Sequence, residues 1–163
     1  EKASSGICVF AKSYTAEKHF FNVFSNGSKD TFVMKYYAAV SLINSKKLDD
    51  NPNGTVTGGL LTTKKSGNKP VIVKKGGNLI KTNYQLIGSN NITAMVRKDR
   101  TSKPESTSID VKLLALEPIT LKTYQMRASC FSLDAPIIGD KKYNSNIVRT
   151  KEKQIYLHFG YLS

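Results

Sequence analysis

The sequence contains no tryptophan, only two cysteines and two histidines, and only four arginines among its 25 basic residues. The lack of tryptophan excludes a carbohydrate platform built on indole rings. Two cysteines and two histidines cannot easily supply the four closely spaced ligands of a structural zinc site. No apolar run approaches the roughly 20 residues that a membrane-spanning helix requires. The sequence therefore predicts no transmembrane segment, no metal site and no cofactor.

Recognisable catalytic motifs are missing too. The chain has no Gly-x-Ser-x-Gly, no His-Glu-x-x-His, no phosphate-binding Gly-x-x-x-x-Gly-Lys-Ser/Thr and no Cys-x-x-Cys sequence. His19 and His158 both adjoin apolar residues, where a histidine is more often structural than catalytic. The acidic residues are scattered, apart from Asp49 and Asp50 in a predicted loop. We therefore predict no catalytic residues and a protein that is not an enzyme.

Acidic residues are scarce, 12 against 25 basic ones, so the net charge is +13. Residues 64–103 carry +9 of this charge, and Asp99 is the one acid among them. Such a concentration of charge attracts anions, although lysines on turns and edge strands also prevent aggregation. The scarcity of arginine favours diffuse attraction over the reading of nucleic-acid bases. The predicted anion-binding residues are Lys64, Lys65, Lys69, Lys74, Lys75, Lys81, Arg97, Lys98, Arg100 and Lys103.

Cys8 and Cys130 each lie in an apolar stretch. In a secreted protein they would form a disulfide, and closing so long a loop would stabilise the fold by about 4–5 kcal/mol in the chain-entropy model. The alternative is two buried free thiols, because unpaired cysteine is itself commonly buried. We predict the disulfide, which also indicates an oxidising compartment.

Apolar residues alternate with other residues along several stretches, as they do in half-buried strands. The clearest are residues 32–42, 92–96 and 155–161, and residues 119–126 alternate with one slip. Asn26-Gly27 predicts a hairpin turn that pairs residues 20–24 with residues 32–37. Many strands with regular turn signals favour a mainly β fold, a single antiparallel β-sandwich of immunoglobulin-like or jelly-roll-like type with about eight to ten strands and little helix. We expect one domain over residues 1–163, with a core that includes Phe10, Phe32, Met34, Tyr36, Val40, Leu113, Leu121, Leu157 and Phe159.

These features together predict a non-enzymatic binding or structural module that is secreted, periplasmic or on the cell surface, its targeting peptide already removed. An adhesin, a fimbrial subunit or a host-binding virulence factor with a basic face for sulfated glycans fits this description. The alternating C-terminal strand resembles the strand through which bacterial fimbrial subunits engage a chaperone, so a protein partner could bind there by strand addition. A nucleic-acid-binding or viral structural β-barrel is the second hypothesis, favoured by the charge. An enzyme with an unrecognised site is the third.

Overall fold

The computed structural model describes residues 4–26, 33–41, 47–63, 66–96, 103, 105–143 and 155–163. Seven strands form one mixed sheet in the order β1-β7-β2-β6-β5-β3-β4. The strands are β1 (Ser5–Gly6), β2 (Met34–Ser41), β3 (Asn53–Thr62), β4 (Pro70–Val73), β5 (Asn78–Val96), β6 (Glu105–Pro118) and β7 (Leu157–Leu162). The helices are α1 (Tyr14–Asn26), α2 (Lys47–Asp50) and α3 (Gln125–Ser132). None of the helices in the described ranges is long and apolar enough to cross a membrane.

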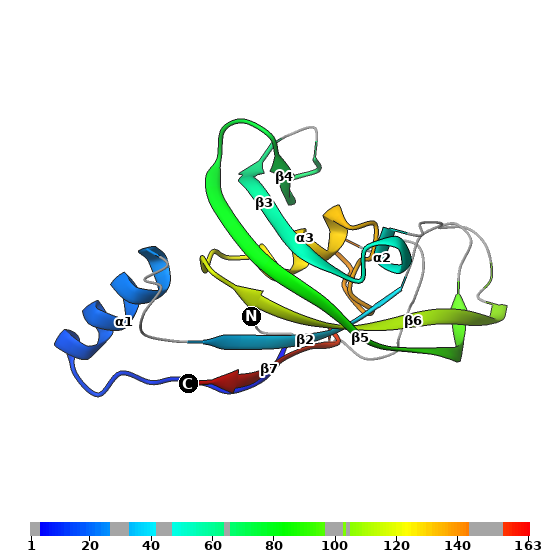
Figure 1. Ribbon diagram of the computed structural model, residues 1–163, viewed down its shortest axis with the longest axis horizontal. Coiled ribbons are helices and arrows are strands. Elements are labelled where there is room, and N and C mark those ends of the chain that lie inside the picture. The colour runs from blue at the N-terminus through cyan, green and yellow to red at the C-terminus, as the bar shows by residue number, and fades with distance from the viewer. Residues whose placement is uncertain are drawn as a thin grey trace.

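Among the described residues, helices and a loop cover one face of this sheet. α2 and α3 lie on the same side of the strands, whereas α1 stands away from the sheet near its β7 end (Figure 1). The covered face carries Ala38, Val40, Leu114 and Leu116, which pack against α3 and the segment that follows it. Because successive side chains of a strand point to opposite faces, their neighbours, such as Leu113, lie on the other face. The apolar stripe of β2 and β6 is thus buried by a helix and a loop.

The prediction of a mainly β protein with little helix is confirmed, but the sandwich architecture is wrong. The described strands form a single sheet, and β1 pairs with β7 in parallel, so the sheet is not purely antiparallel. A sandwich needs a second sheet over the apolar face. Here Met126 and Cys130 of α3, with Ala135 and Ile137 after it, occupy that place.

Two segments predicted as strands are not strands. Residues 20–24, expected to pair with residues 32–37 in a hairpin, lie within α1. Residues 119–126, in which the apolar alternation slipped once, form a loop and the start of α3. Both segments are short apolar runs, whose period does not distinguish a strand from a helix. In the other alternating stretches, residues 34–41, 92–96 and 157–161 lie in β2, β5 and β7.

The predicted core is correct in part. Met34, Val40 and Leu157 are buried, and Tyr36, Leu121 and Phe159 are half-buried. Phe10 is 84% exposed and Leu113 39% exposed, so both assignments are wrong. Leu113 lies on the uncovered face of β6, and Phe10 lies in the apolar segment between β1 and α1, which the described residues leave exposed. Phe32 falls outside the described residues.

Ile80 and Leu79 are adjacent in β5 but point to opposite faces, with 0% and 72% exposure. We expect Ile80→Ala to lower the free energy of unfolding by about 2–5 kcal/mol, because it leaves a cavity in the core. The matched change Leu79→Ala should stay within about 0.5 kcal/mol of the unmodified protein. Urea unfolding followed by circular dichroism measures both, and equal losses would contradict the assignment of the two faces.

Candidate functional site

A pocket of about 540 Å³ opens between the sheet and the segment that leads into α3. Its wall combines aromatic rings, aliphatic side chains and one cation. The described lining residues are Ser4, Phe21, Tyr36, Leu121, Lys122, Thr123, Tyr124, Gln125, Met126 and Leu157. None of them is a carboxylate, so the pocket is suited to an uncharged or anionic ligand with an aromatic part.

Gln125 holds the wall of this pocket in place. Its side chain is buried, and its amide nitrogen donates to the Lys81 carbonyl at 3.2 Å and to Thr82 Oγ1 at 2.9 Å on β5. Its amide oxygen accepts hydrogen bonds from Thr120 Oγ1 at 3.1 Å and from the Lys122 N–H at 3.0 Å. One side chain therefore ties the loop before α3 to the central sheet, and a fixed loop fixes the shape of the pocket.

Arg127 and Asp140 form a buried ion pair behind the pocket wall. Arg127 Nε and Nη2 donate to Asp140 Oδ2 and Oδ1, both at 2.6 Å. The Asp140 side chain is fully buried, and its Oδ1 also accepts the N–H groups of Lys142 at 3.0 Å and Tyr143 at 3.2 Å. A carboxylate with this many donors is a structural anchor. It joins α3 to the turn at residues 139–143.

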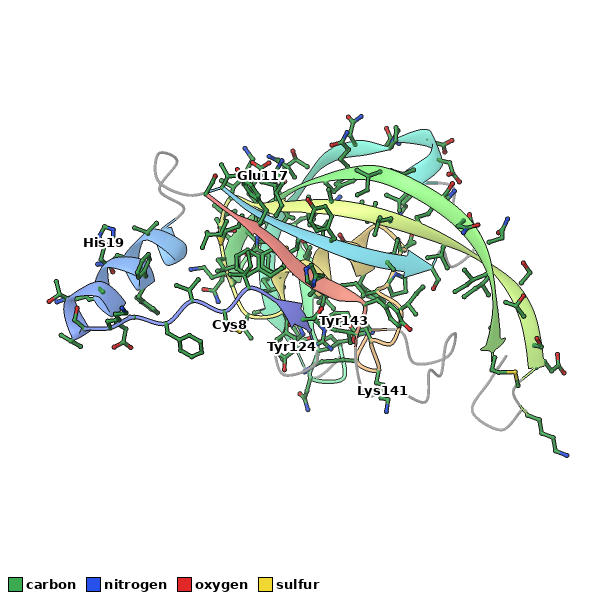
Figure 2. All side chains as sticks on the ribbon, turned by 90° about the horizontal axis from the view of Figure 1, so that it is seen from below. Cys8, His19, Glu117, Tyr124, Lys141 and Tyr143 are labelled. Atoms are coloured by element: carbon green, nitrogen blue, oxygen red, sulfur yellow. The ribbon has the colours of Figure 1, made fainter. Side chains whose placement is uncertain are left out.

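A second hollow, of about 420 Å³, lies on the uncovered face of the sheet. Side chains that lie in register across β2, β6, β5 and β3 form a polar stripe along it: Lys35, Asn53, Thr55, Asn83, Gln85 and Glu117. Thr55 Oγ1 donates to Asn83 Oδ1 at 2.9 Å. Figure 2 shows this face, with Glu117 far from Tyr124 and Tyr143. The hollow offers hydrogen-bonding groups on an open surface.

The two histidines belong to neither hollow. His158 Nδ1 lies 3.0 Å from Ser5 Oγ, a contact between β7 and β1. His19 projects from α1, away from the sheet (Figure 2). Within the described part of the chain, no carboxylate contacts either ring. The described residues therefore show no catalytic histidine–carboxylate pair.

The basic residues predicted to bind an anion do not form one described cluster. Lys69 lies just before β4 and Lys74 and Lys75 just after it, whereas Lys81 lies on β5. Lys103 lies near the far end of the β5–β6 ribbon, where Val96 pairs with Glu105. Lys64, Lys65, Arg97, Lys98 and Arg100 fall outside the described residues. Anion binding by this set stays a prediction.

One lysine outside that set is buried. The Lys112 ammonium lies 2.9 Å from Asp49 and 3.1 Å from Asp110, and hydrogen bonds to these two carboxylates raise its pKa above the usual value. A lysine with a raised pKa stays protonated near neutral pH and cannot act as a base. Lys112 thus joins β6 to α2.

The predicted disulfide does not form. Both thiols are free, Cys8 exposed beside β1 and Cys130 buried in α3. Cys130 packs in the apolar core against the sheet, whereas Cys8 belongs to the exposed segment that leads to α1. The compartment inferred from the disulfide therefore loses its support.

Comparison with known proteins finds similarity to proteins that are named as pseudouridine synthases. No protein-family model matches it. It is 26% identical to ribosomal large subunit pseudouridine synthase C of Rickettsia prowazekii over 159 residues, which are 97% of this chain and 44% of that protein. The synthase of Rickettsia felis is likewise 26% identical, over 97% of this chain and 44% of that protein. The chain therefore spans less than half the length of the curated relatives that it matches.

Solved structures with a similar fold are also named for pseudouridylate synthase domains. The human RNA pseudouridylate synthase domain-containing proteins 1 and 4 each superpose with a TM-score of 0.57, at 18% and 20% identity. The superpositions cover 93% and 92% of this chain, and 56% and 59% of the human chains. At this level of identity the likeness concerns the fold, and the fold shared is that of pseudouridine synthases.

These findings correct several predictions. The relatives along nearly the whole chain are RNA-modifying enzymes, so the assignment to a non-enzymatic adhesin, fimbrial subunit or virulence factor is wrong. The prediction that sulfated glycans are the main partner is wrong. The comparisons favour nucleic acid, which was ranked below them. β7 is already paired on both sides, by β1 and β2, which removes the argument for a partner strand there. The predicted secreted or surface location depended on the adhesin assignment and is therefore wrong too.

The sequence analysis missed Gln125, Arg127 and Asp140. A signal was present, because Arg127 stands among apolar and small residues in a chain with only four arginines. An arginine buried in such a run requires a carboxylate partner. The partner lies 13 positions further on, a spacing that no short motif reveals.

We expect Asp140→Asn to lower the free energy of unfolding by about 3–5 kcal/mol, because it leaves Arg127 buried without a counter-charge. Asp134→Asn is the matched control, since the Lys47–Asp134 pair is about half exposed and contributes about 0–1 kcal/mol. Urea unfolding measures both, and equal losses would contradict the structural role given to Asp140.

We expect the two thiols to react very differently. Burial raises the pKa of Cys130 to about 12, so its thiolate should be absent from the native protein between pH 7 and 9. Ellman's reagent should titrate one thiol rapidly and the second only after denaturation. Cys8→Ser should abolish the rapid phase, and a rapid phase that persists in this variant would contradict the assignment.

Proposed function

We propose that this chain is part of an RNA pseudouridine synthase, in which its described residues bind and position RNA. The observation that carries the proposal is the agreement of two independent similarities. Sequence over 97% of the chain and fold over 92–93% of it both lead to proteins named for pseudouridine synthesis. Large-subunit ribosomal RNA is the substrate class that the names of the curated relatives suggest.

The geometry supports an RNA-binding role. An enzyme that rebuilds a base–sugar bond must take the nucleotide out of the stack, and aromatic or apolar side chains commonly receive the extruded base. The pocket beside Tyr36 and Tyr124 has such a wall and adds the Lys122 cation. A net charge of +13 attracts the phosphates.

The described residues offer few groups that could act on the reacting bonds themselves. Isomerisation of uridine breaks the bond from N1 to the sugar and forms a bond from C5 to the same sugar carbon, while C5 loses a proton and N1 gains one. Asp140 is occupied by Arg127, and none of the described pocket residues is a carboxylate. We therefore assign the described pocket to binding and orientation of the nucleotide.

Activity is tested with RNA that carries tritium at C5 of uridine, because the new bond at C5 displaces that hydrogen. We expect the polypeptide, produced with all the sequence that flanks these 163 residues in its gene, to release tritium from large-subunit ribosomal RNA. If the protein binds RNA but releases tritium from none of the RNAs tested, the synthase proposal is refuted.

Binding is tested on the 163-residue chain itself. We expect it to bind large-subunit ribosomal RNA more tightly than heparin at matched salt. About six phosphate contacts would cost roughly a thousandfold in affinity between 50 and 200 mM salt. Fluorescence anisotropy at several salt concentrations measures both ligands, and tighter binding to heparin would contradict RNA as the partner.

A further inference from the structure

Three aromatic rings and three cations form a connected series of cation–π contacts on the α3 side of the molecule. Lys69 Nζ lies 4.2 Å from the ring centre of Phe131 and 5.8 Å from that of Tyr143. The Arg127 guanidinium follows, 5.4 Å from the Tyr143 ring and 4.9 Å from the Tyr124 ring. Lys142 Nζ ends the series 4.4 Å from the Tyr124 ring. We call these residues the cation–aromatic ladder.

The inner part of the ladder has a structural explanation. Tyr143 is buried and its hydroxyl donates to the Pro70 carbonyl at 2.5 Å, which ties the turn at residues 139–143 to β4. Arg127 is neutralised by Asp140. Phe131 packs on Tyr143 with ring centres 5.4 Å apart. These contacts hold α3, β4 and the turn together.

The outer end, Tyr124 and Lys142, is not explained in this way. Tyr124 has φ 67° and ψ 4°, in the left-handed region that side chains with a β-carbon rarely adopt. It also occupies the position before α3 at which Ser, Thr, Asp or Asn would cap the helix, and it makes no side-chain cap. A residue that contradicts two local preferences at once is characteristic of a functional position.

Tyr124 and Lys142 offer two complementary chemistries, one in the pocket wall and one beside it. The Tyr124 ring is half-buried and lines the 540 Å³ pocket. Lys142 is half-buried and, within the described residues, forms no ion pair, since Asp140 is occupied by Arg127. The exposed Lys141 precedes it and adds a second positive charge (Figure 2). A ring beside unneutralised ammonium groups is the combination that binds single-stranded nucleic acid, by stacking and by phosphate contact.

We propose that the outer end of the ladder is an RNA subsite: the Tyr124 ring contacts a base of the bound strand, and the Lys142 ammonium contacts an adjacent phosphate. This inference rests on the proposed function and adds to it the residues that hold the strand at the pocket. The strained backbone places the ring at the pocket, and the inner ladder fixes the turn that carries Lys142.

The test compares Tyr124→Leu, which removes the ring, with Tyr124→Phe, which keeps it. Both keep the β-carbon and hence the backbone strain, and Tm confirms that each variant is folded. Base stacking on one aromatic side chain corresponds to about five- to a hundredfold in affinity. For a single-stranded RNA oligonucleotide we expect Tyr124→Leu to raise Kd at least fivefold and Tyr124→Phe to leave it within twofold. Tyr14→Leu, on the exposed start of α1, is the control for loss of a surface ring.

Lys142→Gln tests the phosphate contact without disturbing a packed ring. Each lost contact to a single strand should reduce the slope of log K against log salt by about 0.7. We expect this reduction for Lys142→Gln and not for Lys18→Gln, which removes the same charge from an exposed position on α1. The salt dependence of Lys142→Gln still tests the proposed subsite if Tyr124→Leu fails to fold.

The outcomes separate the inference from the proposed function. Absence of RNA binding by the unmodified chain would refute the RNA-binding role itself. If the unmodified chain binds RNA, an unchanged Kd for folded Tyr124→Leu overturns the stacking contact, and an unchanged salt slope for Lys142→Gln overturns the phosphate contact. A Kd raised equally by Tyr124→Leu and Tyr124→Phe would also overturn the stacking contact.

Discussion

A guanidinium group buried beside an apolar core must be neutralised where it lies, and Asp140 meets this requirement for Arg127 through two hydrogen bonds of 2.6 Å. The arrangement of α3, β4 and the turn at residues 139–143 depends on this pair. It fixes the turn at residues 139–143 against α3, and the turn carries Tyr143, which reaches β4 through the Pro70 carbonyl. Charge, hydrogen bonding and aromatic packing thus converge on one helix that lies across the sheet.

The pocket depends on the same helix. Gln125, at the first position of α3, reaches β5 with its amide nitrogen and holds the preceding loop with its amide oxygen. The part of the wall that Tyr124 supplies is therefore fixed to α3 and to β5. Nucleotide recognition needs a preorganised wall, because ordering a loose loop on binding would reduce affinity.

The opposite side of the molecule is much less enclosed. One sheet face carries a polar stripe around Asn83 and Glu117, and the segment from Ile7 to Phe10 exposes apolar side chains. The curated relatives extend over more than twice the length that this chain matches. The described residues build the covered face and its pocket, and pseudouridine synthesis as a whole belongs to the longer architecture of those relatives.

Local pattern alone predicted that the chain is mainly β, because the alternation in β2, β5 and β7 expresses burial of one face of a strand. The net charge likewise predicted an anionic partner, since electrostatic attraction does not depend on the fold. The charge did not indicate which kind of anion binds, because RNA and sulfated glycans are both negatively charged polymers. Short apolar runs, as in α1 and before α3, were assigned to strands because their period is ambiguous.

Tertiary structure alone decided the site. Arg127 and Asp140, or Tyr124 and Lys142, become neighbours only when α3 ends and the chain turns back towards the sheet. The identity of each residue says that it can carry charge or stack, whereas its role depends on burial and on the groups that face it. The sequence by itself therefore determined that the chain is mainly β and that its charge is positive. Packing decided which charges are neutralised inside the protein and which remain available to a ligand.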